Sequence, residues 1–398
     1  MTRTSSSLRL EQVQPPRELG GLSTRAFVVG ALGAAACVAG FVVNAPQFFH
    51  SYLVGWLLWL TVGLGCLGLL MLQHLSGGLW GLMSRRAMEA GARTLPLLLV
   101  LGVPLFFGLG RIFSWTDRAL VAGDPVLLKK TAYLNQPFFV ARTVAILLVF
   151  SYFAWSLSRK SAALDATGDP RLKKAMHDQS AIGLLLFFLL STLLSFDWLM
   201  SLDPHWYSSL YGGIFAAGAG IAALAVLILT ANWLRGRAPM ADIYKKRNFH
   251  DWGKLLFAFV MFFTYLAISQ FVIMYQGNLP EEVLWYQHRF EGGWQWMAVA
   301  LLVFHFFFPF LILLSRDVKE KANGLAAIAG FVLFMRFVDI VWQATPTFHE
   351  HGFAMSWLDL AAPIAVGGLW VGSYLRELGK HGLLPVGEPA LQEALGHE

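Results

Sequence analysis

Acidic, histidine and aromatic residues lie close together in one short polar stretch between two apolar runs. This stretch, residues 195–213, reads SFDWLMSLDPHWYSSLYGG and contains Asp197, Trp198, Asp203 and His205. Carboxylate and imidazole groups can accept and release protons, and ionisable groups beside hydrocarbon are usually there for a function. An interfacial belt of Trp and Tyr around a solvated turn explains the same residues equally well. The stretch is therefore a candidate site for proton chemistry, with the belt as its alternative.

A second candidate group lies within the apolar runs themselves. His305 lies about 11 residues into the run 294–314, which places it roughly 16 Å deep in a helix that rises about 1.5 Å per residue. Arg336 and Asp339 are three residues apart, so on a helix they share a face and can pair. We interpret the three residues as a proton relay inside the membrane. The alternative is an Arg–Asp pair that only holds helices together.

The composition sets the class of protein. Hydrophobic residues make up 57% of the 398 residues and charged residues 14%, whereas soluble domains carry roughly a quarter charged residues. The net charge of +6 comes from short loops between apolar runs, which is typical of membrane proteins and does not predict nucleic-acid binding. Cys37 and Cys66 both lie in apolar runs and form no CxxC motif, so we expect no zinc, iron–sulfur cluster or c-type haem on this chain.

The apolar runs predict an all-α integral membrane protein. Because a span needs about 20 mostly apolar residues, about ten spans are expected. They lie near residues 26–44, 52–73, 94–110, 137–157, 180–196, 211–233, 253–275, 294–314, 325–342 and 357–375. Arg and Lys gather in the loops on one side, which predicts cytoplasmic tails at 1–25 and 376–398. The segments 45–51, 111–136, 197–210, 276–293 and 343–356 then face the periplasm.

The polar stretch and the segments around it resemble a known family. The stretch 195–213, the helix start IFAAGAG after it, and the outer loop NLPEEVLWYQHRFEGGW are similar to the smaller quinol-type membrane subunit (ActF) of bacterial alternative complex III. This subunit is related to the NrfD and polysulfide-reductase membrane subunits. The resemblance covers residues 26–375. It implies two four-helix bundles, formed by spans two to five and six to nine, in the segments 26–210 and 211–375, with spans one and ten flanking them.

The resemblance also implies a function and partners. The complex is a quinol:cytochrome c oxidoreductase of the bacterial inner membrane that oxidises quinol on the periplasmic side. Its expected partners are a sister NrfD-like membrane subunit, an iron–sulfur subunit, c-type cytochrome subunits and a terminal oxidase, all in a lipid bilayer. This chain would bind a quinone or menaquinone, take part in proton translocation, or do both, without being catalytic alone.

The family's chemistry can be placed on particular residues. Quinol oxidation needs an acceptor for two protons and an apolar slot for the ring. Asp197, Asp203 and His205 would take the protons toward the periplasm, and Trp198 would wall the slot. Docking against a neighbouring subunit is an alternative role for the same residues. Two other functions remain open at this point: a ten-helix secondary transporter, and a purely structural membrane anchor.

Overall fold

The protein is built from helices that run lengthwise between two ends of the molecule. The computed structural model of the chain describes residues 10–349 and 352–396, and every regular element in these ranges is a helix. Ten segments of the described ranges are long and apolar enough to span a membrane, which confirms the predicted all-α membrane fold. They are α1 (Glu18–Val43), α2 (Ala45–Ser76), α3 with α4 (Leu79–Phe107), α8 (Gln136–Thr167), α9 (Pro170–Trp198), α10 (Tyr211–Leu234), α12 (Lys246–Gly277), α14 to α15 (Trp294–Leu314), α17 (Ala322–Ala344) and α18 (Leu358–Leu378).

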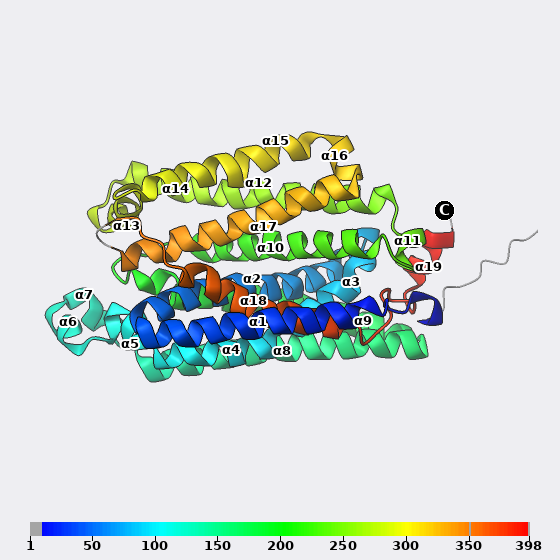
Figure 1. Ribbon diagram of the computed structural model, residues 1–398, viewed down its shortest axis with the longest axis horizontal. Helices are drawn as coiled ribbons and strands as arrows, with labels where there is room; N and C mark the ends of the chain where they lie inside the picture. The colour runs from blue at the N-terminus through cyan, green and yellow to red at the C-terminus, as the bar shows by residue number, and fades with distance from the viewer. Residues whose placement is uncertain (1–9, 350–351, 397–398) are drawn as a thin grey trace, which may run out of the picture.

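Short helices close the two ends. Both ends of the described chain lie on the right in Figure 1, and we call this side the terminal end and the opposite side the distal end. The short helices are η1 (Leu10–Val13), α5 (Leu109–Ile112), η2 (Ser114–Thr116), α6 (Arg118–Gly123), α7 (Pro125–Lys130), η3 (Met200–Leu202), α11 (Met240–Ile243), α13 (Pro280–Phe290), α16 (Arg316–Glu320), η5 (Thr345–Phe348) and α19 (Pro389–Gly396). Of these, α5 to α7 and α13 lie at the distal end.

Local sequence signals explain where several long helices begin. Asn44 accepts a hydrogen bond from the backbone N–H of Gln47 at the start of α2, and Asn135 does the same for Phe138 at the start of α8. In both helices a proline occupies the first turn, where it costs no hydrogen bond. The side chain of Asp169 caps α9 in the same way.

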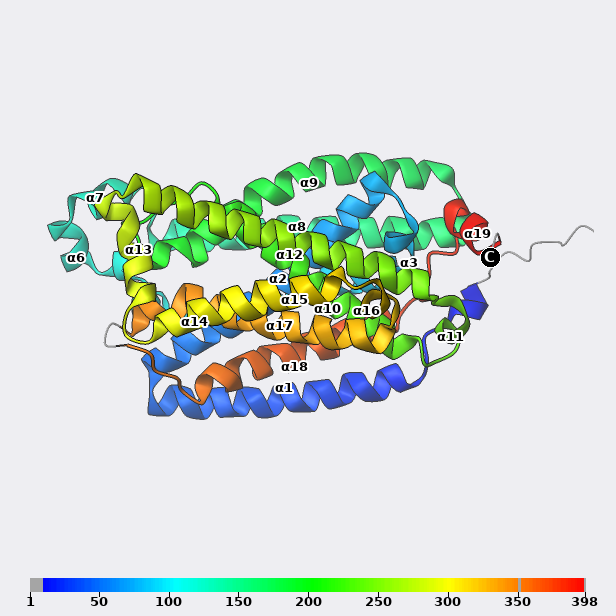
Figure 2. The ribbon, with the colours of Figure 1, turned by 90° about the horizontal axis from the view of Figure 1, so that it is seen from above.

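Helices α2 and α10 form the centre of the molecule. They pack against each other so closely that a Cβ atom on Gly65 of α2 would lie 1.9 Å from the carbonyl oxygen of Ala219 on α10. Close approach through small residues is how membrane helices gain packing contacts without a hydrophobic driving force. The first group of helices comprises α2 together with α3–α4, α8 and α9, which all contact α2. The second group comprises α10, α12, α14–α15 and α17: α12 and α17 pack on α10, and the span α14–α15 packs on α12 and α17. Helix α1 packs on α18 along one edge of the molecule (Figure 2).

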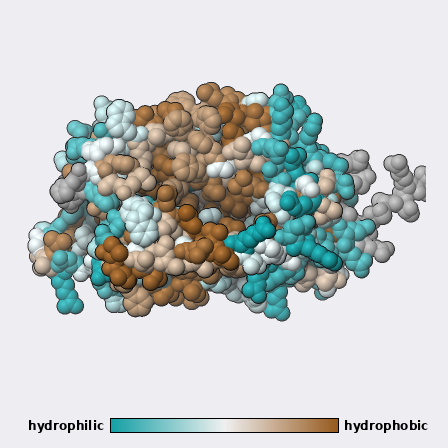
Figure 3. All heavy atoms as spheres, viewed as in Figure 1, coloured by the Kyte–Doolittle hydropathy of each residue, from teal (hydrophilic) through white to brown (hydrophobic). Residues whose placement is uncertain are grey.

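The surface carries an apolar band between two polar ends. In Figure 3 hydrophobic side chains cover the middle of the visible face, and hydrophilic side chains gather at both ends. Large apolar side chains such as Leu32, Leu185 and Leu311 are more than 60% exposed. Lipid tails solvate such side chains, so this distribution is that of a multi-pass membrane protein.

The third span differs from its predicted position. The span was expected at 94–110, which leaves Arg85 and Arg86 in the loop before it. In the structure the span begins at Leu79, because helix α3 (Leu79–Ala92) forms its first part. The chain bends at Thr94, between α3 and α4 (Leu95–Phe107), where Pro96 starts the new helix. Arg85 and Arg86 are only 2% and 4% exposed. They tolerate burial because carboxylates pair with both of them, which a hydropathy pattern does not reveal.

The eighth span is irregular around His305. It consists of α14 (Trp294–Ala300), a π-helical segment η4 (Leu301–Phe307) and α15 (Phe308–Leu314). Pro309 has no N–H to donate to the carbonyl of His305, the α-helical partner four residues earlier, so the regular bonding pattern cannot continue there. Such π-helical turns are frequent at functional sites.

Candidate functional site

An apolar cavity with one polar side lies in the second group of helices. Its volume is about 580 Å³, and its walls come from α10, α12, α13, the span α14–α15 and α17. Most lining side chains are apolar, and the polar ones include Tyr211, Gln270, His305, Asp339 and Gln343. Ile268, Val299 and Leu302 line the cavity and are also exposed on the outer surface of their helices. The cavity therefore opens sideways into the apolar band.

A chain of hydrogen bonds forms the polar side of the cavity. Arg336 and Asp339 form a buried ion pair on one face of α17, which confirms the predicted pairing. Gln343, one turn further along, donates from Nε2 to Oδ2 of Asp339 at 2.6 Å. Tyr211 of α10 donates to Oε1 of Gln343 at 2.8 Å. Among the described residues both contacts of Asp339 go to Oδ2, so its Oδ1 remains available to a ligand.

The guanidinium of Arg336 is held in place by the neighbouring helices. It lies over the ring of Phe263 on α12, 5.0 Å from the ring centre. On the other side it lies against Gly218 of α10, where an added Cβ would come within 2.4 Å of Nη2. The charge thus rests on an aromatic face and against bare backbone. This packing fixes the position of the carboxylate of Asp339.

His305 lies on the same cavity and packs against the same aromatic ring. The imidazole is 5.1 Å from the ring of Phe263 and its residue is 4% exposed. Its Nε2 atom is buried and has no hydrogen-bond partner among the described residues. A buried nitrogen without a partner costs free energy, and a ligand hydroxyl or carbonyl in the cavity would satisfy it. The structure thus brings His305 and Asp339 of the predicted relay to one cavity, and Arg336 contacts that cavity through its ion pair with Asp339.

Aromatic side chains of α13 cover the distal side of the cavity. Trp285 stacks on Trp206 with ring centres 4.6 Å apart, and the guanidinium of Arg289 lies 3.8 Å from the ring centre of Trp285. Nη2 of Arg289 donates to the backbone carbonyl of Gln343 at 2.6 Å, and its Nη1 lies 3.3 Å from Oδ2 of Asp203. Asp203 is therefore connected to the cavity through one buried guanidinium.

The electrostatics of this cover follow from burial. Burial lowers the pKa of Arg289, and the opposing charge of Asp203 restores part of the loss. Burial raises the pKa of Tyr286, which also lines the cavity, to about 12. The phenol therefore stays neutral at physiological pH, and Nε2 of Gln270 donates to its hydroxyl oxygen at 3.4 Å.

The polar stretch 195–213 is divided between two places. Asp197 and Trp198 end α9 and point into the first group, and Asp203 and His205 follow the short helix η3 and line a cleft of about 480 Å³ at the distal end. Nε2 of His205 lies 2.5 Å from Oδ2 of Asp124, which fastens the α6–α7 segment to the turn. The geometry does not join the four residues into one pocket.

Asp197 and Trp198 are surrounded by the core of the first group. The carboxylate of Asp197 receives two hydrogen bonds from Arg142 of α8, both of 2.7 Å. Trp198 packs against Trp56 and donates to the hydroxyl oxygen of Thr143 at 3.1 Å. Both side chains are 0% exposed. Their contacts are those of a packed helix interface.

Several residues of the cavity escaped prediction from the sequence. Gln343 lies four residues after Asp339, so the helical spacing that pairs Arg336 with Asp339 would also have indicated it. Arg289 and Phe263 carry no such signal, because only the folded chain brings them to α17. Gln270 was visible as a polar residue in an apolar run, although its orientation was not.

Comparison with known proteins does not assign the chain to a family. No protein-family model matches the sequence, and no curated protein is significantly similar to it. The function must therefore be argued from the cavity and its residues.

Proposed function

We propose that the protein is a quinone-binding membrane subunit of a multi-subunit quinol-oxidising complex in a bacterial inner membrane. The observation that carries the proposal is the sideways-opening apolar cavity whose polar side holds His305, Asp339 and Gln343. A quinone combines an apolar ring and tail with two ring oxygens. A mostly apolar pocket with a few convergent polar groups has the matching chemistry.

The polar residues have distinct roles in this proposal. The ring lies in the apolar part of the cavity, and the tail leaves through the side opening into lipid. Nε2 of His305 hydrogen-bonds one ring oxygen, and Oδ1 of Asp339 or the amide of Gln343 bonds the other. The aromatic cover around Trp285 keeps bulk water away from the ring.

The redox balance requires partners. Oxidation of one quinol to quinone releases two protons and two electrons. His305 and Asp339 are the groups that take protons from the ring oxygens. The electrons pass to iron–sulfur and c-type haem groups of partner subunits and from there to a terminal oxidase, as the resemblance to alternative complex III implies. The distal end, with the cover α13 and the α6–α7 segment, is the proposed periplasmic side, where those subunits dock beside the sister membrane subunit.

This proposal assigns the four residues of the polar stretch differently from the sequence-based expectation. Both carboxylate oxygens of Asp197 are already bonded to Arg142, and Trp198 is packed against Trp56. Neither residue therefore takes part in quinol oxidation in this proposal. Asp203 acts on the cavity through Arg289. His205 belongs to the distal cleft, where a docked partner would lie.

Binding of a quinone to the purified protein in lipid nanodiscs tests the proposal. Trp285 and Trp342 line the cavity, so a bound quinone should quench tryptophan fluorescence in a saturable way. We expect His305→Ala and Gln343→Leu to weaken binding about tenfold, the equivalent of one lost hydrogen bond of ~1.4 kcal/mol. His250→Ala, at the terminal end of the same wall helix α12, is the matched control and should leave binding unchanged. Equal affinity in all three variants, or no saturable quenching, would refute the proposal.

A further inference from the structure

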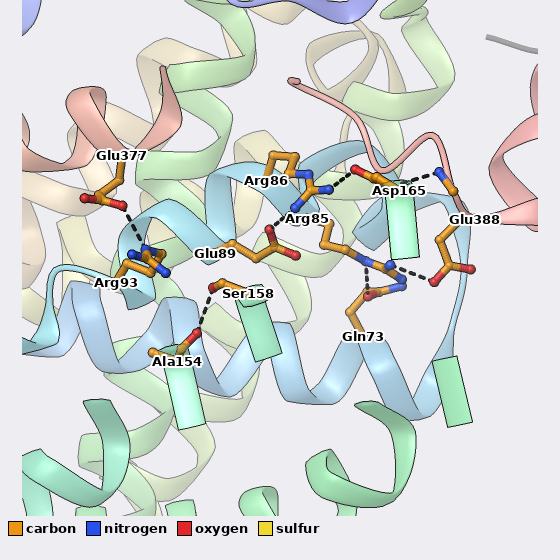
Figure 4. Close-up of polar contacts among 11 residues, drawn as sticks. Gln73, Arg85, Arg86, Glu89, Arg93, Ala154, Ser158, Asp165, Glu377 and Glu388 are labelled. Atoms are coloured by element: carbon orange, nitrogen blue, oxygen red, sulfur yellow. Dashed lines mark hydrogen bonds and ion pairs between the residues drawn. The ribbon is translucent and has the colours of Figure 1, made fainter. Parts of the chain in front are cut away.

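A second group of buried charges lies in the first group of helices, at the terminal end (Figure 4). At its centre the guanidinium of Arg86 on α3 points between two carboxylates. Nη1 lies 2.5 Å from Oε2 of Glu89, and Nη2 bonds Oδ2 of Asp165 on α8. All three side chains are at most 6% exposed. Two carboxylates therefore share one cation in a place that water hardly reaches.

The neighbouring group holds one extra positive charge, but the residue that carries it, Lys173, is 54% exposed, so solvent screens that charge from Arg86. Arg85 donates from Nε to Gln73 at 3.1 Å and from Nη1 to Oε1 of Glu388 at 2.7 Å. The second oxygen of Glu388 lies 3.2 Å from Nζ of Lys173. Glu388 thus has two cations of its own, whereas Arg86 alone balances two carboxylates. One negative charge is left over at Arg86.

One carboxylate oxygen next to Arg86 has, in the described part of the chain, no partner that would stabilise the excess negative charge. Oε1 of Glu89 is buried and has no hydrogen-bond partner among the described residues. Ser161, one helical turn before Asp165 on α8, is fully buried and its hydroxyl likewise has none there. An uncompensated buried carboxylate is expensive, and two carboxylates on one cation lower that cost by binding a proton.

We propose that Glu89 and Asp165 form a proton-binding site, in which the two carboxylates hold one proton beside Arg86. With that proton the three groups are neutral as a unit. Without it they carry one negative charge in a low-dielectric interior. The site exchanges its proton with solvent at the terminal end. It does not depend on quinone binding, because none of its residues lines the cavity of the second group.

The segment after α18 covers the site. This C-terminal strap, residues 379–388, is hydrogen-bonded to Asp165 itself, because the backbone N–H of Gly387 donates to Oδ1 at 2.9 Å. The backbone of Gly387 lies so close to α8 that an added Cβ would be 2.5 Å from the carbonyl oxygen of Leu164. The strap is also anchored by the fully buried Leu384 and by a 2.8 Å bond from Leu383 N–H to the carbonyl of Val13. A proton must pass this strap to reach the site.

Other titratable groups surround the site on every side and set its field. They are His74 on α2, Arg85 and Arg93 on α3, Lys173 and His177 on α9, Glu377 on α18, and His381 and Glu388 in the strap. His381 interacts electrostatically with both Arg86 and Glu89 and is itself exposed. It is therefore an exposed, exchangeable group of the strap that interacts with the site.

Infrared difference spectroscopy of the full chain in lipid nanodiscs tests the site directly. A protonated carboxyl group gives a C=O band that a carboxylate lacks, so wild-type protein at neutral pH should show this band. Either Glu89→Gln or Asp165→Asn should remove it, because one remaining carboxylate is balanced by Arg86. Glu320→Gln, in an exposed pair with Arg316, is the control and should retain the band. If one of the two site variants does not fold, as judged by thermal melting, the other decides the question.

The strap has its own test. Gly387→Ala forces the backbone away from Asp165, so deuterium from the solvent should reach the protonated carboxyl about tenfold faster, since a weakened closed state raises the open population. Gly236→Ala, in a place with nothing within 4 Å, should not change the rate. Absence of the band in wild-type protein, or its persistence in both site variants, would overturn the proton site. An unchanged exchange rate in Gly387→Ala would overturn the role of the strap.

Discussion

Arg142 and Asp197 form a buried two-bond ion pair between residues that are 55 positions apart, with Nε–Oδ2 and Nη2–Oδ1 distances of 2.7 Å. The guanidinium also lies over the ring of Tyr133, 3.8 Å from its centre. The pair ties the distal ends of α8 and α9 together. Parallel planar bonds of this kind are among the strongest polar contacts that side chains make.

Removing one partner of this pair should destabilise the protein strongly. Asp197→Asn leaves the guanidinium of Arg142 buried without its counter-charge, so we expect the free energy of unfolding to fall by about 3–5 kcal/mol. Thermal melting in detergent would measure the loss. The double variant Arg142→Met with Asp197→Leu should recover most of it, because two apolar side chains need no counter-charge. A single variant as stable as the wild type would show that the pair is solvated.

Gly218 should matter for the cavity although it does not line it. Gly218→Ala adds a methyl group 2.4 Å from Nη2 of Arg336, so the guanidinium must leave its place and Asp339 moves with it. We expect a stability loss of about 1–3 kcal/mol from overpacking and a clear loss of quinone affinity. Melting and fluorescence quenching measure the two effects. Gly236→Ala is the control, and equal behaviour of the two variants would contradict the prediction.

The C-terminal strap should loosen in acid. Burial raises the pKa of Glu388, but Arg85 and Lys173 lower it by more, so its pKa lies below the ordinary value of about 4.3. A depressed pKa in the folded state contributes stability at pH values above the ordinary pKa, and this contribution is lost as the pH falls through the folded value. Hydrogen exchange of the strap should therefore accelerate below about pH 4. In Glu388→Gln the strap should exchange fast at neutral pH and show little further acid dependence. Pronounced acid loosening in that variant would assign the effect to another group.

Arg289 should not tolerate lysine. Its guanidinium reaches the carbonyls of Trp285 and Gln343 and the carboxylate of Asp203 while stacking on the indole of Trp285. One ammonium cannot replace this planar set of donors, so Arg289→Lys should cost about 1–3 kcal/mol of stability and weaken quinone binding by opening the cavity cover. Arg316→Lys, with a side chain that is 78% exposed, is the matched control for melting and fluorescence quenching. If Arg289→Lys kept both its stability and its quinone affinity, Arg289 would not be needed to hold the cavity cover in place.

The sequence was most informative where a residue's neighbours lie on its own helix. The pairing of Arg336 with Asp339 followed from a spacing of three, and the spans followed from runs of apolar residues. It was least informative for buried charges in α3. Arg85 and Arg86 looked like loop residues, because hydropathy counts a charge as exposed whether or not a distant carboxylate neutralises it.

The apolar runs alone predict an all-α membrane protein, since a bilayer requires long apolar helices whatever their arrangement, and the described residues contain ten such segments. Which polar residues meet depends on the packing of the folded chain. It separated Asp197 from His205, joined His305 to Asp339 on one cavity, and placed Glu388 over Arg85, all through helix packing between distant segments. Such contacts depend on crossing positions and on small residues that let helices approach, and no local period in the sequence encodes them.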